Sequence, residues 1–260
     1  MSMIQAEFNE SVRYFFVFFE NSLYLTEGRL PDCQSVRELI KNSTVTDSFT
    51  ESDYKFTALE LESEPVQEGS KWTVIPVRQF FYENSKSELC FLCARAKGLL
   101  NFRRDKVYCA KCGGLLQDDR DFTARSCTKC KKQYFPQLEP AVIVLVNRGS
   151  KILLARHQNR SDGMYSCLAG FIEAGETAEH AVKREIMEET NLTVKNIRYA
   201  GTQAWPFPDQ LMLAFTAEYE SGDLKIQEEE IAHADWFDRD ALPKVPGPGS
   251  VAYNLIFGEL

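Results

Sequence analysis

The first third of the chain alternates short apolar runs with polar breaks, a pattern typical of β-strands joined by turns. The runs Arg13–Glu20, Ser22–Thr26 and Trp72–Phe81 are rich in Val, Ile, Phe and Tyr. Because β-branched and aromatic residues favour extended backbone, we expect each run to form a strand. No catalytic motif is visible in this part. The pattern therefore predicts a small β-rich domain over residues 1–86.

The apolar positions then change to a helical period. Between Ser87 and Phe102 they recur at Leu89, Leu92, Cys93, Ala96, Leu99 and Leu100. This spacing predicts a connecting helix. Cys90 and Cys93 fall on it as an apolar Cys-Phe-Leu-Cys without turn residues, which favours packing in the core over metal binding or redox chemistry.

The rest of the chain mixes strand and helix signals. Pro140–Val146 is a continuous apolar strand, followed by a turn at Asn147–Ser150 and a second strand at Lys151–Ala155. A Pro/Gly-rich segment, Pro243–Gly249, precedes a short terminal helix. We therefore expect an α/β domain over residues 137–260.

Composition agrees with a folded protein, since 44% of the 260 residues are hydrophobic and 26% are charged. The apolar stretch Tyr14–Phe19 is too short for a signal peptide and has no cleavage site. No apolar run reaches the roughly 20 residues that cross a bilayer. We expect no membrane association and a cytoplasmic protein.

Charge is unevenly distributed. The chain carries a net charge of −8, yet Arg95–Lys132 holds 11 Lys and Arg against four Asp, a local excess of +7. One interpretation is a solvated cationic surface around a metal module. The other is an electropositive wall that faces a phosphate-bearing ligand.

Four of the eight cysteines form two Cys-x-x-Cys knuckles separated by 14 residues. These are Cys109, Cys112, Cys127 and Cys130. Without a secretion signal, metal binding is the better interpretation than disulfides, and four thiolates suit tetrahedral zinc. Four protein ligands leave no open position, so this zinc should be structural. A redox disulfide pair is the alternative.

Three glutamates lie on one face of a predicted helix that starts near Thr177 and ends near Thr190. Glu185, Glu188 and Glu189 stand at i, i+3 and i+4, where like charges repel unless a cation relieves them. Mg²⁺ and Mn²⁺ favour carboxylate oxygen. The alternative is a solvent-facing charged helix. A solvent-facing helix does not require a Gly-rich turn at Gly170–Gly175 in fixed register with Glu176 and Arg184. The joint occurrence of these features therefore argues against this alternative.

This stretch resembles the Nudix box, Gly-x5-Glu-x7-Arg-Glu-apolar-x-Glu-Glu-x-Gly-apolar. Every defining position matches except the last glycine, which is Asn191 here. That glycine follows the helix and is expected in a left-handed conformation. Asn tolerates this conformation best among the non-glycine residues, so the departure is mild.

A second motif follows the box. Two prolines alternate with Trp205 and Phe207, which predicts a stiff loop that cannot be an interior strand. One interpretation is an aromatic plug of the core beside an edge strand. The motif also resembles the Trp-Pro-Phe-Pro signature of the NAD(H) diphosphatases, the NudC-type Nudix enzymes, with departures at Thr202, Ala204 and Gln210. The knuckles, Tyr134–Gln137 and Pro246–Gly249 extend the resemblance over residues 70–260.

The resemblance implies a Nudix α/β/α sandwich with a mixed sheet over residues 137–260, preceded by the β-rich domain of residues 1–86 and by a linking helix and zinc ribbon over 87–136. It implies metal-dependent hydrolysis of NAD(H) to nicotinamide mononucleotide and AMP, extending to NAD-capped RNA 5′ ends. It also implies a homodimer. Besides structural zinc, one per chain, it implies Mg²⁺ or Mn²⁺ as catalytic cofactor.

The resemblance also assigns residues. It implies Glu185, Glu188 and Glu189 as catalytic residues, with Glu188 completing the metal cluster or acting on the water. The implied Mg²⁺ or Mn²⁺ ligands are the Ala169 carbonyl, Glu185, Glu189 and Glu230, although Glu228 and Glu229 compete with Glu230 on sequence alone. The implied substrate-binding residues are Arg78, Phe135, Phe171, Gln203, Ala204, Trp205, Pro206, Phe207, Pro208, Asp209, Gln210 and Ala252. Of these, Phe171 stacks on nicotinamide, and Phe135 closes the sandwich from a partner subunit.

Two alternatives belong to other classes. A catalytically silent Nudix-fold sensor would bind a nucleotide to regulate a partner, but such a protein should lack one or more metal carboxylates, and all are present here. A zinc-ribbon nucleic-acid adaptor would use the hydrolase fold only incidentally.

Overall fold

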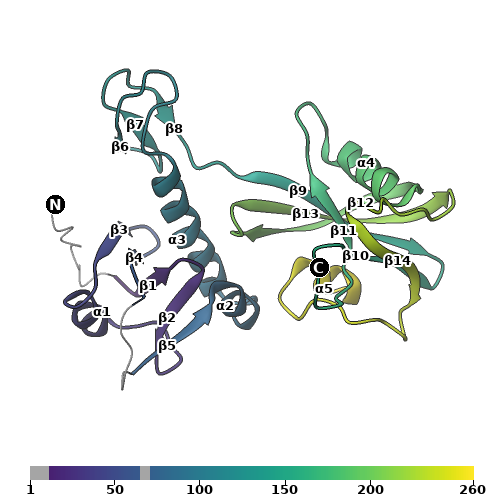
Figure 1. The fold of residues 1–260 in the computed structure, drawn as a ribbon, viewed down its shortest axis with the longest axis horizontal. Helices are drawn as coiled ribbons and strands as arrows, with labels where there is room; N and C mark the ends of the chain where they lie inside the picture. Colours follow the sequence, from purple (N-terminus) through teal and green to yellow (C-terminus); the bar gives the residue numbers. More distant parts are fainter. Residues whose placement is uncertain (1–11, 65–70) are drawn as a thin grey trace. The chain divides into compact units, whose positions relative to one another are not determined.

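The computed structural model describes residues 12–64 and 71–260. The chain forms two compact units, Met1–Gln137 and Leu138–Leu260 (Figure 1). The beginning of the expected domain 1–86 lies outside the described residues. The finer division into three parts stays a prediction.

The first unit begins with a five-stranded sheet in the order β3-β4-β1-β2-β5. Its strands are β1 (Tyr14–Phe19), β2 (Ser22–Thr26), β3 (Val45–Glu51), β4 (Phe56–Leu61) and β5 (Trp72–Pro76). Strands β1 and β4 are parallel, and the other neighbours are antiparallel. The helices of this unit are α1 (Cys33–Ile40), α2 (Val77–Glu83) and α3 (Glu88–Asp105). The β-rich character expected of this part is confirmed.

Only the first half of one expected strand is extended in the structure. The run Trp72–Phe81 was predicted to be extended throughout, but β5 stops at Pro76 and α2 begins at Val77. Val77, Phe80 and Phe81 are buried at i, i+3 and i+4, which is helical spacing. The prediction was wrong because it gave more weight to the aromatic and β-branched composition of the run than to the helical spacing of these three residues.

Helix α3 confirms the predicted connecting helix and leads into a three-stranded antiparallel ribbon (Figure 1). The ribbon strands are β6 (Leu116–Asp118), β7 (Arg125–Cys127) and β8 (Gln133–Tyr134). Arg125 joins the two elements, because its guanidinium donates hydrogen bonds to the carbonyl oxygens of Arg103, Lys106 and Leu116 at 2.8–3.0 Å. Cys90 and Cys93 are buried on α3, and burial raises the pKa of the Cys90 thiol to about 11.

Much of the local positive charge is neutralised inside this unit. Arg95 pairs with Glu51 at 2.6 Å, and Lys97 with Glu60 at 2.9 Å. Arg103 pairs with Asp47 at 2.6 Å and also with Asp118. The cations of α3 therefore fasten the helix to the sheet and the ribbon, which argues against a continuous electropositive wall over Arg95–Lys132.

The second unit contains a mixed sheet in the order β12-β13-β9-β10-β14, with β11 also paired to β9. The strands are β9 (Glu139–Arg148), β10 (Lys151–His157), β11 (Leu168–Phe171), β12 (Thr193–Trp205), β13 (Gln210–Ser221) and β14 (Ile231–Asp238), and the helices are α4 (Ala178–Thr190) and α5 (Val251–Phe257). Strands β13 and β9 run parallel, and the other pairs are antiparallel.

The sheet of the second unit separates two cores. Strand β9 sends Val142, Val144 and Val146 into the core beside α4, and the alternating residues, including Ile143, into the core beside α5. Strand β9 therefore contacts apolar side chains on both faces, which is why it reads as a continuous apolar run. The expected α/β/α sandwich is confirmed. No helix in the described residues is long and apolar enough to cross a membrane.

Candidate functional site

Helix α4 begins and ends at the expected residues. The Thr177 hydroxyl accepts a hydrogen bond from the His180 backbone N–H at 3.3 Å, which caps the first turn. Asn191 ends the helix in a left-handed conformation with φ +58°, as predicted for the position where the Nudix box has glycine. The helix buries Ala181, Val182 and Ile186 together with Glu189. The register of the three glutamates is therefore fixed.

Arg184 is the centre of a hydrogen-bond network. Its guanidinium pairs with Glu176 at 2.7 and 2.9 Å, with Glu185 at 2.8 Å and with Glu188 at 3.0 Å. A further bond at 2.8 Å goes to the carbonyl oxygen of Phe171. The hydrogen bonds from Arg184 lower the pKa of Glu176 to about 2. Arg184 and Glu176 were recognised as motif positions but not predicted as site residues.

The position of the Glu185 carboxylate depends on a glycine in the neighbouring strand β11. A Cβ atom at Gly170 would overlap the Glu185 carboxylate. The missing side chain therefore creates the space that the carboxylate fills. Burial raises the pKa of Glu185.

Glu189 is the most buried acid of the helix, with 2% of the residue exposed. Burial raises its pKa to about 8, and the charges of Glu185, Glu230 and Glu188 act in the same direction. Its Oε2 atom is buried and has no hydrogen-bond partner. Among Glu228, Glu229 and Glu230, the charge of Glu230 raises the pKa of both Glu185 and Glu189, which favours Glu230 as the acid that faces α4.

Two other expected residues lie on β11, the strand that carries Gly170. Ala169 is opposite Ile143 of β9 and partly buried. Phe171 ends the strand with 49% of its surface exposed, so its ring is available to a ligand. Strand β11 and helix α4 thus bring together Ala169, Phe171 and the glutamates.

The Trp-Pro-Phe-Pro motif forms the tip of the hairpin between β12 and β13. Trp205 pairs with Gln210 at the end of the ladder, and its ring meets Phe207 edge-to-face at 5.0 Å. Strand β12 is an edge strand, so the expectation that the motif is not an interior strand is confirmed. Of the other positions predicted here, Pro206 is buried, Asp209 is partly buried, and Ala204 and Pro208 are exposed. The Phe207–Pro208 peptide bond is cis.

Gln203 fastens β12 to the start of α5. Its side-chain amide donates to the Gly249 carbonyl at 2.8 Å and accepts from the Val251 N–H at 2.8 Å. Ala252 follows directly and is 5% exposed, packed in the core beside α5. The structure thus brings Gln203 and Ala252 together. The Gln203 side-chain amide is hydrogen-bonded to backbone groups of Gly249 and Val251.

Two predicted substrate residues belong to the first unit. Arg78 is exposed on α2. Phe135 is 53% exposed after β8, and its ring meets Phe122 edge-to-face at 6.2 Å.

The four knuckle cysteines form a compact cluster in the ribbon. The Sγ atoms of Cys109 and Cys130 are 3.6 Å apart, those of Cys112 and Cys127 are 3.5 Å apart, and all four lie within 4.8 Å. Within the described residues it is the one group of three or more potential ligands gathered closely enough to hold a metal ion. The glutamates of α4 are not gathered so tightly.

Two neighbours shape this cluster. A Cβ atom at Gly114 would lie 2.9 Å from the Cys127 sulfur, so the turn needs glycine there. The Tyr134 hydroxyl lies 3.2 Å from the Cys109 sulfur, where it can donate a hydrogen bond to a thiolate. The donor set and its surroundings suit a metal that prefers four thiolates.

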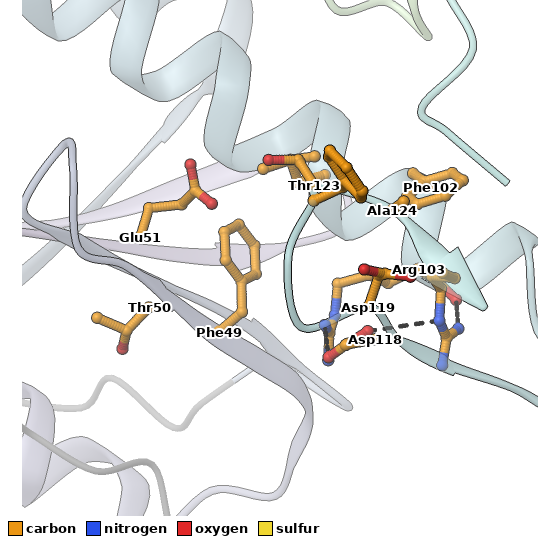
Figure 2. Close-up of a pocket in the computed structure, with 12 residues that line it drawn as sticks. Phe49, Thr50, Glu51, Phe102, Arg103, Asp118, Asp119, Thr123 and Ala124 are labelled. Carbon is orange, nitrogen blue, oxygen red and sulfur yellow. Dashed lines mark hydrogen bonds and ion pairs between the residues drawn. The ribbon is translucent and has the colours of Figure 1, made fainter. Parts of the chain in front are cut away.

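A separate cavity of about 190 Å³ lies between β3, α3 and the hairpin that joins β6 to β7 (Figure 2). Glu51, Arg103, Asp118 and Arg125 line it, and these charged groups pair with one another or with neighbours. None of the predicted site residues lines this cavity. Its charged residues form ion pairs that connect the helix, the sheet and the ribbon.

The fold and the helix of glutamates define a Nudix domain, and the NUDIX domain family matches residues 137–255. The chain is 37% identical over 243 residues to the NAD-capped RNA hydrolase NudC of Yersinia enterocolitica, covering 94% of this chain and 90% of that protein. It is 50% identical over 163 residues to the protein of the same name in Chromobacterium violaceum, covering 63% of this chain and 62% of that one. Identity to the NudC of Escherichia coli O9:H4 is 46% over 165 residues, covering 64% of each protein. The chain belongs to the NudC family of Nudix hydrolases.

Proposed function

We propose that this protein hydrolyses the diphosphate bond of NAD(H), giving nicotinamide mononucleotide and AMP, and that it removes NAD caps from RNA 5′ ends. The main support is the identity of 37% over 94% of the chain to a protein named NAD-capped RNA hydrolase. The intact carboxylate set on α4, held by Arg184, supports hydrolysis over a silent sensor.

The acids of α4 suit a hard divalent cation. Glu189 has a buried oxygen without a hydrogen-bond partner beside other carboxylates, and such an arrangement is costly unless a cation or a proton compensates it. We assign the Ala169 carbonyl, Glu185, Glu189 and Glu230 as ligands of Mg²⁺ or Mn²⁺. When bound, the cation supplies charge neutralisation for the diphosphate and Lewis-acid activation of the attacking water.

The surrounding residues orient these groups. Arg184 holds Glu185 and Glu188 in place, while Glu176 holds Arg184 from the other side. The Glu188 side chain is 52% exposed, so it can reach water and take the proton of the nucleophile. The half-exposed ring of Phe171 stacks on the nicotinamide. The residues from Gln203 to Gln210, with Ala252, line the substrate site.

We infer that the cysteine cluster holds one structural zinc ion. A tetrahedral site with Zn–S bonds of about 2.3 Å separates its sulfur atoms by about 3.8 Å, close to the 3.5 and 3.6 Å found here. Metal analysis of the purified protein should give one zinc per chain. The Cys127→Ser protein should lose it and unfold at lower temperature, whereas Cys33→Ser should retain it.

We also infer a homodimer in which Phe135 completes the substrate site of the partner. The exposed pair Phe122–Phe135 supports this, because an aromatic pair is costly to leave in water. Light scattering should give twice the chain mass. Phe135→Ala should raise the KM for NADH about tenfold, while Phe135→Tyr should preserve it. A monomer with full activity would contradict the inference.

Substrate profiling with product identification tests the proposed function. Wild-type protein with Mg²⁺ or Mn²⁺ should form AMP from NADH and from NAD-capped RNA, and Glu189→Gln should not. A wild-type protein that binds NADH without forming AMP would favour the silent sensor. Filter binding of RNA to Glu189→Gln, with no hydrolysis by the wild type, would favour the nucleic-acid adaptor.

A further inference from the structure

The two knuckles of the ribbon carry exposed lysines, and an exposed aromatic ring directly precedes the first knuckle. We call the set Tyr108, Lys111, Leu115, Lys129 and Lys131 the knuckle surface. We propose that it binds the single-stranded RNA that follows the cap. The proposal rests on the proposed function and deepens it by assigning the RNA part of the substrate to residues other than those proposed for the diphosphate chemistry.

Three members of the knuckle surface, Tyr108, Leu115 and Lys131, are linked by hydrogen bonds that involve the backbone. Tyr108 and Leu115 face each other in an antiparallel bridge. The Leu115 carbonyl accepts hydrogen bonds from both the N–H and the hydroxyl of Thr128 at 3.0 Å. The Lys131 ammonium in turn donates to the Thr128 carbonyl at 3.2 Å. These contacts connect Tyr108, Leu115 and Lys131 through Thr128.

Lys129 lies close to Gly114, the residue before Leu115. A Cβ atom at Gly114 would lie 3.0 Å from Cγ and 3.1 Å from Cδ of Lys129, so the stem of Lys129 runs over this glycine. Lys111 is exposed in the first knuckle, between Cys109 and Cys112.

The lysines of this surface differ from the cations of α3 in their ion pairing. Within the described residues, Lys111, Lys129 and Lys131 form no ion pair with an acid, whereas Arg95, Lys97 and Arg103 all do. Lys132, next to them, lies 5.1 Å from the Tyr134 ring centroid. The charge of Lys111, Lys129 and Lys131 therefore remains available to a ligand.

The apolar members point to RNA rather than to a simple polyanion. Tyr108 is 67% exposed and Leu115 is 52% exposed, although both lie in backbone fixed by the bridge. Single-stranded nucleic acid is bound by cations that follow the phosphates and by aromatic rings on which bases stack. Duplex RNA keeps its bases stacked inside and offers phosphates and 2′-hydroxyls, but no free base face, to such a surface.

The competing explanation is that these lysines only offset the negative charge of four thiolates around a metal. That role requires charge but not an exposed tyrosine. It also predicts that removal of the lysines weakens metal binding and leaves RNA binding unchanged. The two explanations therefore differ in measurable ways.

Binding of an uncapped, fluorescein-labelled ten-nucleotide RNA to the full-length protein tests the proposal without any hydrolysis. The test variant combines Lys111→Gln, Lys129→Gln and Lys131→Gln. The control combines Lys41→Gln, Lys55→Gln and Lys195→Gln, three exposed lysines elsewhere in the chain. Each phosphate contact contributes about 0.7 to the salt slope of single-strand binding, so the test variant should lose about 2 from the slope of log Kd against log salt. The control should keep the wild-type slope.

A second comparison does not change charge. Tyr108→Ala should weaken binding of the single strand about tenfold, while Tyr108→Phe should preserve it, and neither should affect binding of a duplex. In turnover, the triple test variant should lose about tenfold in kcat/KM on NAD-capped RNA and nothing on NADH. Zinc content should stay at one per chain in all variants.

Equal salt slopes in the two triple variants, or equal RNA affinity of Tyr108→Ala and Tyr108→Phe, would overturn the proposal. Failure of the proposed function would appear separately, as a wild-type protein that forms no AMP from NADH while its RNA binding can still be measured.

Discussion

Gly170 and Glu185 occupy positions that exclude a side chain at residue 170, because a Cβ atom there would overlap the Glu185 carboxylate. Strand β11 and helix α4 therefore approach each other closely through a glycine. The close approach places Glu185 beside Gly170, which directly follows Ala169, another member of the proposed cation site.

Gly170→Ala tests this relationship. The added methyl group should displace Glu185 and lower kcat with NADH at least tenfold, together with the affinity for Mn²⁺, since misplacing a catalytic group by about 1 Å can cost 100-fold. Gly247→Ala is the matched control, because no atom lies within 4 Å of its Cβ position. Full activity of Gly170→Ala would show that the close approach is not needed.

The burial of Glu189 should appear in the pH dependence of stability. Its folded pKa of about 8 lies above the usual value of 4.5, so the folded state binds more protons between these pH values. Without added Mg²⁺ or Mn²⁺, stability should therefore fall as pH rises from about 4.5 to 8, by on the order of a few kcal/mol. Urea unfolding should show this decline in the wild type and a smaller one in Glu189→Gln. Added Mn²⁺ should stabilise the wild type alone.

Glu176 should show the opposite dependence. Arg184 lowers the pKa of Glu176 to about 2, so its stabilising contribution is complete above the usual value of 4.5 and is lost as pH falls towards 2. Glu176→Gln should lower Tm by a few degrees at pH 7. The difference from wild type should shrink in thermal melts between pH 4.5 and pH 2. A difference that stays constant with pH would contradict the assigned ion pair.

Asn191 offers a test at the end of α4. Left-handed backbone costs a residue with a Cβ atom about 1–2 kcal/mol, and Asn reduces this cost through polar contacts such as its 3.2 Å bond to the Asp223 carbonyl. Asn191→Ala should lower the unfolding free energy by about 1 kcal/mol, and Asn191→Gly should change it by less than about 0.5 kcal/mol. Both should retain NADH hydrolysis if the departure from the Nudix box is as mild as the sequence predicts.

The sequence predicted the parts that depend on local patterns. The ends of α4 follow from Thr177 and Asn191, and the doubly buried strand β9 follows from an unbroken apolar run. The helical spacing of Val77, Phe80 and Phe81 was missed, because three apolar residues do not distinguish a strand from a helical turn.

The rest depends on contacts between distant residues. Arg103 pairs with Asp47, 56 positions away. Composition alone therefore could not show that part of the positive charge of the ribbon region is neutralised. The engagement of Gln203 with the start of α5 is equally remote, at 46 positions from Gly249. The central role of Arg184 had a local signal, since the box fixes its spacing from Glu176 and Glu185.

The three carbonyl oxygens bound by Arg125 have a consequence for protein engineering. Two of them belong to the end of α3 and its first following residue, and the third belongs to β6. A transplant of residues 107–135 into another scaffold would carry Arg125 but would lose two of its three carbonyl acceptors, those of Arg103 and Lys106. The smallest portable version of the ribbon therefore includes the last turn of the preceding helix.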